Sequence, residues 1–220
     1  GRVQTVLGTI DPRDLGVTLC HEHLLVDVSS FMDPPTDETD IAFYEAPLTL
    51  ENLGYIRHYH APNFDNGILD DVDIAIEEAK LYAESGGHSV IDVTSLGIGR
   101  NPQGLEAISR GTGLNVVMGA SYYVADAHPD DMSDRSEDQI VDEIVRDVTE
   151  GVDGTAIKAG VIGEVGGSWP MTENERKVLR ASARAQRITG APLLVHPGRD
   201  QHAPLEIIDV VREAGGELGR

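Results

Sequence analysis

The chain has 220 residues, of which 40% are hydrophobic and 25% charged, a composition typical of a folded globular protein rather than a disordered or fibrous one. Its 38 acidic and 17 basic residues give a net charge of −21, which disfavours nucleic-acid and membrane partners because their phosphates are also anionic. No apolar run approaches the roughly 20 residues that span a bilayer, and the opening GRVQTVLGTIDPRDLG lacks the apolar stretch of a signal peptide. The single cysteine, Cys20, is expected to be buried in a strand. One cysteine cannot form an intrachain disulfide, and together with the missing signal peptide this predicts a cytoplasmic protein.

The predicted elements alternate between strands and helices along most of the chain. VTLCHEHL at 17–24 is the first strand, and a long polar insertion over 25–69 separates it from a helix over 70–86. After that helix, each apolar run is followed by a segment whose apolar residues have helical spacing. The further strands are predicted at 89–98, 115–124, 156–166 and 191–198, and the further helices at 101–113, 136–151, from Thr172 onward and at 204–214.

Strands rich in Val, Ile and Leu that alternate with single helices indicate an α/β fold with a covered parallel sheet. Five β/α units are present, whereas a (β/α)8 TIM barrel needs eight. No glycine-rich phosphate fingerprint follows the first strand, which disfavours an open doubly wound sheet. We therefore predict that residues 1–220 form a single barrel domain that is incomplete at its C-terminal end. The first and fifth strands should then each have an unpaired edge, and the insertion should form an active-site loop.

Three histidines and one glutamate stand at predicted strand ends. His21 and His23 are two residues apart, so they project from the same face of a strand and can converge on one ion such as Zn²⁺. Taken alone, this pair is as consistent with a structural role as with a metal site. Glu164 lies in an apolar strand, where a buried charge needs a partner, and a salt bridge to Lys158 or an arginine is the alternative to a metal. His196 ends the neighbouring strand, which completes a ligand set suited to a hydrolytic metal.

Four segments carry a resemblance to a known family: VTLCHEHLLVD, VIDVTSLGIGRNP, GVIGEVGGSWPMTENERKVLRASARAQ and PLLVHPGRD. They resemble the phosphotriesterase-related branch of the phosphotriesterase family, within the amidohydrolase superfamily, over essentially the whole chain. The resemblance implies a TIM barrel of the metal-dependent hydrolase type with two divalent metal ions, usually zinc. His21 and His23 would bind the more buried ion, His196 the more exposed one, and Glu164 would bridge them where phosphotriesterase proper has a carboxylated lysine. Two further family ligands, a histidine and an aspartate on later strands, would lie beyond Arg220, so we expect the chain to be a fragment.

The resemblance also implies the activity. We expect hydrolysis of an ester, lactone or amide by a hydroxide that two zinc ions activate, with Glu164 as both a catalytic residue and a metal ligand. An organophosphate substrate is the alternative within this enzyme class, and a catalytically inactive binding barrel is the alternative outside it. The expected partner is a small-molecule substrate, and a homodimer is left open.

Several further residues are candidates for substrate binding. Arg100 and Arg199 follow the second and fifth strands and are the cations best placed for an anionic group, although a structural salt bridge is an equal alternative for each. Tyr122 and Tyr123 follow the third strand, and because neighbours alternate, one should line the pocket while the other packs outward; we assign the pocket role to Tyr122. His58 and His60 form a second pair in the insertion, where no strand enforces convergence, so we expect surface or pocket-rim residues.

Overall fold

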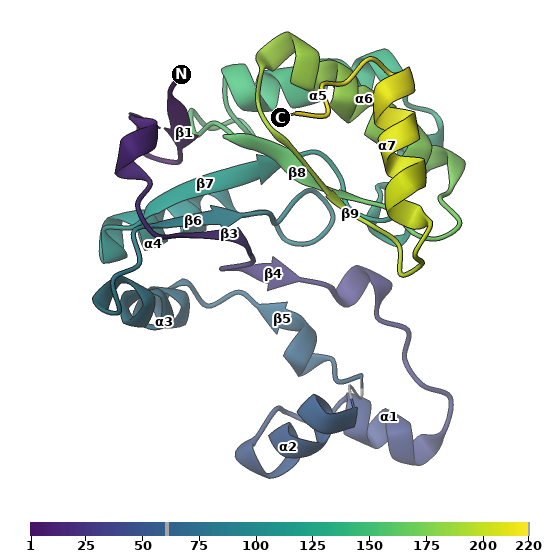
Figure 1. Ribbon diagram of the computed structural model, residues 1–220. Coiled ribbons are helices and arrows are strands. Elements are labelled where there is room, and N and C mark those ends of the chain that lie inside the picture. The colour runs from purple at the N-terminus through teal and green to yellow at the C-terminus, as the bar shows by residue number, and fades with distance from the viewer. Residues whose placement is uncertain (60–61, 220) are drawn as a thin grey trace.

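The structure is a computed structural model that describes residues 1–59 and 62–219. Its centre is a curled parallel sheet with the strand order β3-β6-β7-β8-β9 (Figure 1). The strands are β3 (Thr18–Glu22), β6 (Ser89–Asp92), β7 (Asn115–Ala120), β8 (Val161–Gly166) and β9 (Leu193–His196). Each is followed by a helix, in the order α3 (Val72–Glu84), α4 (Pro102–Thr112), α5 (Glu137–Thr149), α6 (Glu173–Thr189) and α7 (Ala203–Glu213). These five β/α units confirm the predicted α/β class and correspond to the first five units of a TIM barrel.

The helix ends follow local sequence signals. At the start of α6, the Thr172 hydroxyl accepts from the Glu175 amide while the Glu175 carboxylate accepts from the Thr172 amide, the capping box that the sequence predicts. At the end of α4, Gly113 has a φ of 77°, a left-handed conformation that a residue without Cβ adopts without steric cost. The boundaries therefore lie within a few residues of the predicted ones for α3 to α7.

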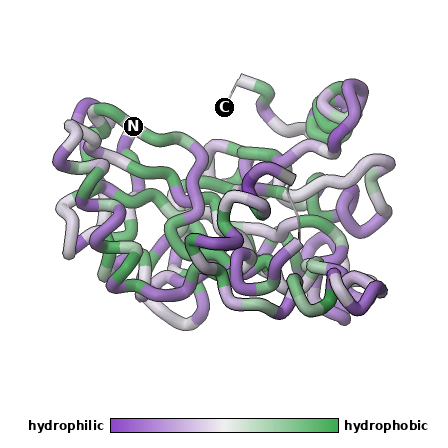
Figure 2. The backbone as a smooth tube through the Cα atoms, turned by 90° about the horizontal axis from the view of Figure 1, so that it is seen from below, coloured by the Kyte–Doolittle hydropathy of each residue, from purple (hydrophilic) through white to green (hydrophobic). Residues whose placement is uncertain are grey.

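The main core lies between the sheet and the helices that surround it. Along β7, the alternate residues Val116, Met118 and Ala120 are fully buried, and they share one apolar cluster with Ile140 and Ile144 of α5. Figure 2 shows apolar and polar segments alternating along the chain, as expected where each helix buries one face. This packing holds the helices outside the curl and leaves the inner face of the sheet for the strand-end side chains.

Two parts of the chain are more structured than predicted. The N-terminal segment forms an antiparallel hairpin of β1 (Val3–Thr5) and β2 (Gly8–Ile10), followed by the short 3-10 helix η1 (Pro12–Asp14). The insertion contains two α-helices that lie away from the main sheet in Figure 1. Its elements are β4 (Val26–Asp27), η2 (Ser29–Phe31), α1 (Glu38–Tyr44), α2 (Leu50–Tyr59), η3 (Asp65–Gly67) and β5 (Ile68–Leu69), while η4 (Ala125–Ala127) and η5 (Asp130–Ser133) lie between β7 and α5.

The two edge strands of the sheet are β3 and β9, each paired on one side within the described residues, as predicted for the first and fifth strands. The side chain of Cys20 on β3 is exposed, so the expectation that it packs in a core is wrong: no described strand covers the free edge of β3. None of the described helices combines the length and apolar character needed to cross a bilayer.

Candidate metal centre

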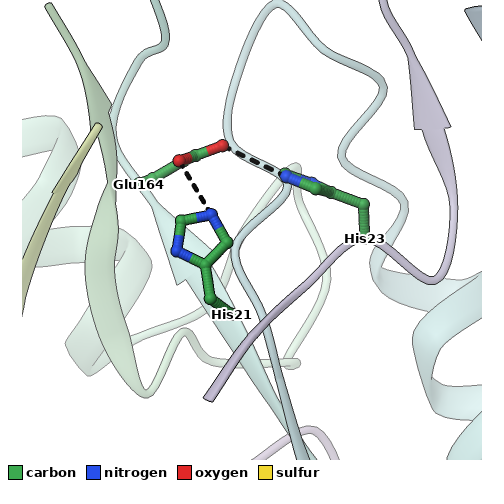
Figure 3. Close-up of side chains that lie close together, drawn as sticks. All are labelled: His21, His23 and Glu164. Atoms are coloured by element: carbon green, nitrogen blue, oxygen red, sulfur yellow. Dashed lines mark ion pairs between the residues drawn. The ribbon is translucent and has the colours of Figure 1, made fainter. Parts of the chain in front are cut away.

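The histidines and the glutamate identified in the sequence meet at the carboxyl ends of the strands. His21 lies near the end of β3 and His23 directly follows it, while Glu164 lies in β8 and His196 is the last residue of β9. Figure 3 shows Glu164 pointing across the inside of the sheet toward His21 and His23. The carboxyl end of the strands is where barrels of this type place their sites.

Three imidazoles converge on the single Glu164 carboxylate. Its Oε2 lies 3.0 Å from Nε2 of His21 and 3.0 Å from Nδ1 of His196, and its Oε1 lies 3.1 Å from Nε2 of His23. In a flat sheet β3 and β8 would be three strand spacings apart, roughly 14 Å, so these contacts require the curl. The alternative partner Lys158 instead donates its Nζ to the carbonyl of Thr149.

Glu164 is ionised in this environment. Only 1% of its side chain is exposed, and burial alone would raise its pKa. Hydrogen bonds with His196 and His23 and the positive charge that His196 and His21 can carry outweigh burial and lower the pKa to about 2. The carboxylate therefore offers two anionic oxygens to whatever the histidines hold.

The hydrogen bonds of His23 define which of its ring nitrogens carries a proton. The Thr94 hydroxyl has one hydrogen, and it donates this hydrogen to the carbonyl oxygen of Leu25 at 3.0 Å. The same hydroxyl lies 3.0 Å from Nδ1 of His23, so it must accept from that nitrogen. In the neutral imidazole, Nε2 is then a lone pair that faces the anionic Oε1 of Glu164 at 3.1 Å.

Two acceptors at this separation need a cation between or beside them. A second proton on His23 is one solution, because Glu164 outweighs the effect of burial and raises the pKa of His23. A divalent metal ion is the other, and the donor set of imidazole nitrogens and a carboxylate is one that zinc prefers. One nitrogen each from His21 and His23 and one oxygen of Glu164 lie within 4.8 Å of one another. The residues present therefore fit a metal.

The structure does not bring Arg100 to this cluster. Its guanidinium donates to Asp147 at 2.7 Å and to Asp153 at 2.8 Å, and 2% of its side chain is exposed. The predicted substrate-binding role is therefore corrected to the structural salt bridge, the alternative that the sequence left open.

The roles of the two tyrosines are the reverse of those predicted. The hydroxyl of Tyr122 donates to Glu143 at 2.7 Å and accepts from Arg135 at 2.6 Å, and the residue is 2% exposed. The hydroxyl of Tyr123 lies 3.4 Å from both ring nitrogens of His196. Burial and the Glu164 charge raise the pKa of Tyr123 to about 12, so this hydroxyl is protonated at neutral pH. The tyrosine beside the cluster is therefore Tyr123.

The Arg199 side chain stays available for a ligand. It is exposed, and no other described residue forms an ion pair or hydrogen bond with its guanidinium. Its positive charge partly opposes the rise in the pKa of Tyr123, which places it on the side of the cluster where Tyr123 and His196 lie. Of the second histidine pair, His58 is exposed in α2, and His60 lies outside the described residues.

Two residues near the centre were not predicted. Asp92, the last residue of β6, and Thr94 are fully buried, and both bind the segment that carries His23. The signal was present in VIDVTS, because a carboxylate in an apolar strand needs a partner for the same reason as Glu164.

We expect Tyr122→Phe and Tyr123→Phe to affect different properties. Tyr122→Phe should lower the free energy of unfolding by about 1–2 kcal/mol, because it removes the hydrogen bonds of the hydroxyl to Glu143 and from Arg135. Tyr123→Phe should instead lower kcat/KM about tenfold, equivalent to about 1.4 kcal/mol, with little change in stability. Urea unfolding and steady-state kinetics of the full-length variants separate the two, and a loss of kcat/KM confined to Tyr122→Phe would restore the original assignment.

The chain as a whole is similar to known proteins. Residues 1–220 match the group described as the Phosphotriesterase family. The chain is 39% identical over 221 residues to the N-acetyltaurine hydrolase of Danio rerio and 41% identical over 223 residues to the phosphotriesterase-related protein of Nematostella vectensis. All of this chain is covered in both cases, but it spans only 63% and 64% of those proteins.

A solved structure gives the same result. The crystal structure of a resiniferatoxin-binding protein from Rhodobacter sphaeroides is similar to this chain, with a TM-score of 0.95 and 44% sequence identity. The similarity covers 99% of this chain and 61% of that chain. The chain therefore spans less than two thirds of the length of each of these three relatives.

Proposed function

This chain belongs to the phosphotriesterase family, and on that premise we propose that the full-length protein is a metal-dependent hydrolase of amides, esters or lactones. The observation that carries the proposal is the meeting of three imidazoles with one ionised carboxylate, in which Nε2 of His23 lies 3.1 Å from an oxygen of Glu164. A site of this kind can accommodate a cation. Without a metal-binding role the buried negative charge of Glu164 would be costly, because a buried carboxylate in a purely structural role must be compensated.

The proposed ligands divide between two ions. His21 and His23 would hold the first ion, His196 would hold the second, and the Glu164 carboxylate, which all three imidazoles face, would contribute to both. Divalent ions, most simply Zn²⁺, would supply a water molecule that ionises near neutral pH and a positive charge that polarises the scissile bond. The protein supplies the positions of the ligands, and Tyr123 supplies a protonated hydroxyl beside His196.

The surroundings of the site favour a small anionic substrate. Arg199 is an exposed guanidinium, without an ion-pair partner among the described residues, in a protein whose net charge is −21. The curated relatives include proteins named N-acetyltaurine hydrolase, and that name denotes an amide that bears a sulfonate. We infer that Arg199 binds the anionic end of such an N-acylated amine while the amide lies over the metal ligands.

The test uses full-length protein that a chelator has stripped of metal. On addition of Zn²⁺ we expect about two equivalents by elemental analysis and the return of hydrolysis of N-acetyltaurine. Arg199→Gln should raise KM for this anionic amide about tenfold, the loss of about 1.4 kcal/mol of binding, and leave KM for a neutral lactone unchanged.

Other outcomes would contradict the proposal. Less than half an equivalent of metal in the replete protein would exclude a metal-dependent reaction. Hydrolysis of an aryl phosphotriester, but of no amide, ester or lactone, would favour the organophosphate alternative. Two bound ions with ligand binding and no turnover of any of these substrates would favour the inactive binding barrel.

A further inference from the structure

A buried group of polar residues lies behind His23, on the side away from Glu164. Asp92 and Thr94 have 0% and 1% of their surface exposed, and neither touches Glu164 through a hydrogen bond. The Asp92 carboxylate forms no ion pair with a lysine or arginine among the described residues. A buried carboxylate of this kind is costly unless hydrogen bonds compensate it, so its partners indicate what it is for.

Asp92 accepts hydrogen bonds from two backbone amides, one on each side of the contact between His23 and Thr94. Its Oδ2 accepts from the amide of Leu24 at 2.7 Å, and its Oδ1 accepts from the amide of Thr94 at 3.1 Å. Leu24 directly follows His23, and the Thr94 hydroxyl accepts from Nδ1 of His23 at 3.0 Å. The Asp92 carboxylate thus holds two backbone segments. One carries the imidazole of His23, and the other carries Thr94, which accepts the Nδ1–H of that imidazole.

The other histidines lack such a support. No described side chain forms a hydrogen bond with Nδ1 of His21, and 47% of the His21 side chain is exposed, against 29% for His23. Besides Glu164, the Tyr123 hydroxyl approaches His196, but it is 3.4 Å from both ring nitrogens and so selects neither. Within the described part of the chain, His23 is therefore the only one of the three whose second ring nitrogen, the one that does not face Glu164, is held at 3.0 Å by a neighbouring side chain.

We propose that Asp92 and Thr94 are positioning residues for His23: Thr94 fixes the Nδ1–H tautomer, and Asp92 fixes Thr94 and the backbone next to His23. This inference rests on the proposed function, because the Nε2 lone pair that it presents is useful only to a metal. Asp92 and Thr94 support His23, which belongs to the ion that His21 and His23 would bind. They contact no residue that would bind only the other ion, at His196. Groups that orient a metal-bound imidazole in this way typically change metal affinity by 10- to 100-fold.

The test compares Thr94→Val with two matched variants in metal-free full-length protein titrated with Zn²⁺ against a chelating indicator. Thr94→Val keeps the branched shape but removes the acceptor, so one of the two equivalents should bind 10- to 100-fold more weakly while the other is unchanged. Thr94→Ser keeps the hydroxyl and should bind as the parent does. Ser95→Ala is the control, since the Ser95 hydroxyl is equally buried and has no hydrogen-bond partner among the described residues.

The outcomes separate this inference from the proposed function. A parent protein that binds no zinc would overturn both. If the parent binds two equivalents of zinc and Thr94→Val binds them with unchanged affinity, the positioning role alone is overturned. It is also overturned if Thr94→Val loses affinity equally for both equivalents and the metal-free variant melts at a lower temperature, because that pattern indicates a purely structural role.

A second measurement does not depend on the folding of a variant. In ¹⁵N NMR spectra of the zinc-loaded parent, His23 should carry its proton on Nδ1. If Nδ1 of His23 carries no proton in the zinc-loaded parent, the inference is overturned regardless of the results with the variants.

Discussion

Replacing Glu164 with glutamine is expected to remove both metal ions and the hydrolytic activity together. The two carboxylate oxygens face three imidazoles at 3.0–3.1 Å, and glutamine replaces one of these oxygens with an amide nitrogen that has no lone pair for a metal. We expect kcat/KM to fall at least about a thousandfold, or roughly 4 kcal/mol in transition-state stabilisation. Elemental analysis and steady-state kinetics of full-length Glu164→Gln measure the two losses in parallel.

Lys158→Met is the matched control for this prediction. Lys158 is the lysine near the start of the same β/α unit, and its Nζ binds the carbonyl of Thr149 rather than any residue of the cluster. The variant should keep both ions and its activity. If Lys158→Met lost the metal and Glu164→Gln kept it, the assignment of Glu164 as the bridging group would be wrong.

Replacing Arg100 with methionine is expected to destabilise the fold by about 3–5 kcal/mol, because it leaves the Asp147 carboxylate buried without its cation. Burial raises the pKa of Asp147 even with Arg100 beside it, so in the variant this carboxyl should take up a proton and the loss of stability should shrink at low pH. Urea unfolding at pH 5 and pH 8 measures both effects. The activity of the folded fraction should be unchanged, since Arg100 contacts no residue of the metal centre.

Arg110→Met provides the comparison within the same β/α unit. Arg110 pairs with Glu106 on the surface of α4, with 66% of its side chain exposed, so its loss should cost at most about 1 kcal/mol. Equal costs for the two variants would show that burial of the Arg100 pair contributes nothing. A selective rise in KM with Arg100→Met and no loss of stability would return Arg100 to the substrate site.

The sequence alone was enough to predict the five β/α units and the positions of the four candidate ligands. Strand and helix periodicities are local properties of a few residues, as are capping signals such as Thr172 and Glu175. The carboxyl ends of parallel strands meet at one edge of the sheet, so His21, His23, Glu164 and His196 could be expected to face one another before their distances were known.

Which polar groups pair with one another was decided only by the tertiary structure. Arg100 meets Asp147 and Asp153 through loops whose paths have no periodic signal. Alternation predicted that one of Tyr122 and Tyr123 faces the pocket but could not say which, because Ser121 before them has a φ of 82°, and a left-handed residue interrupts the alternation of a strand. The exposure of Cys20 depends on what covers an edge strand, and the support of His23 by Asp92 and Thr94 joins residues about 70 positions apart. Contacts of this kind arise from the curl of the whole sheet, which no short stretch of sequence encodes.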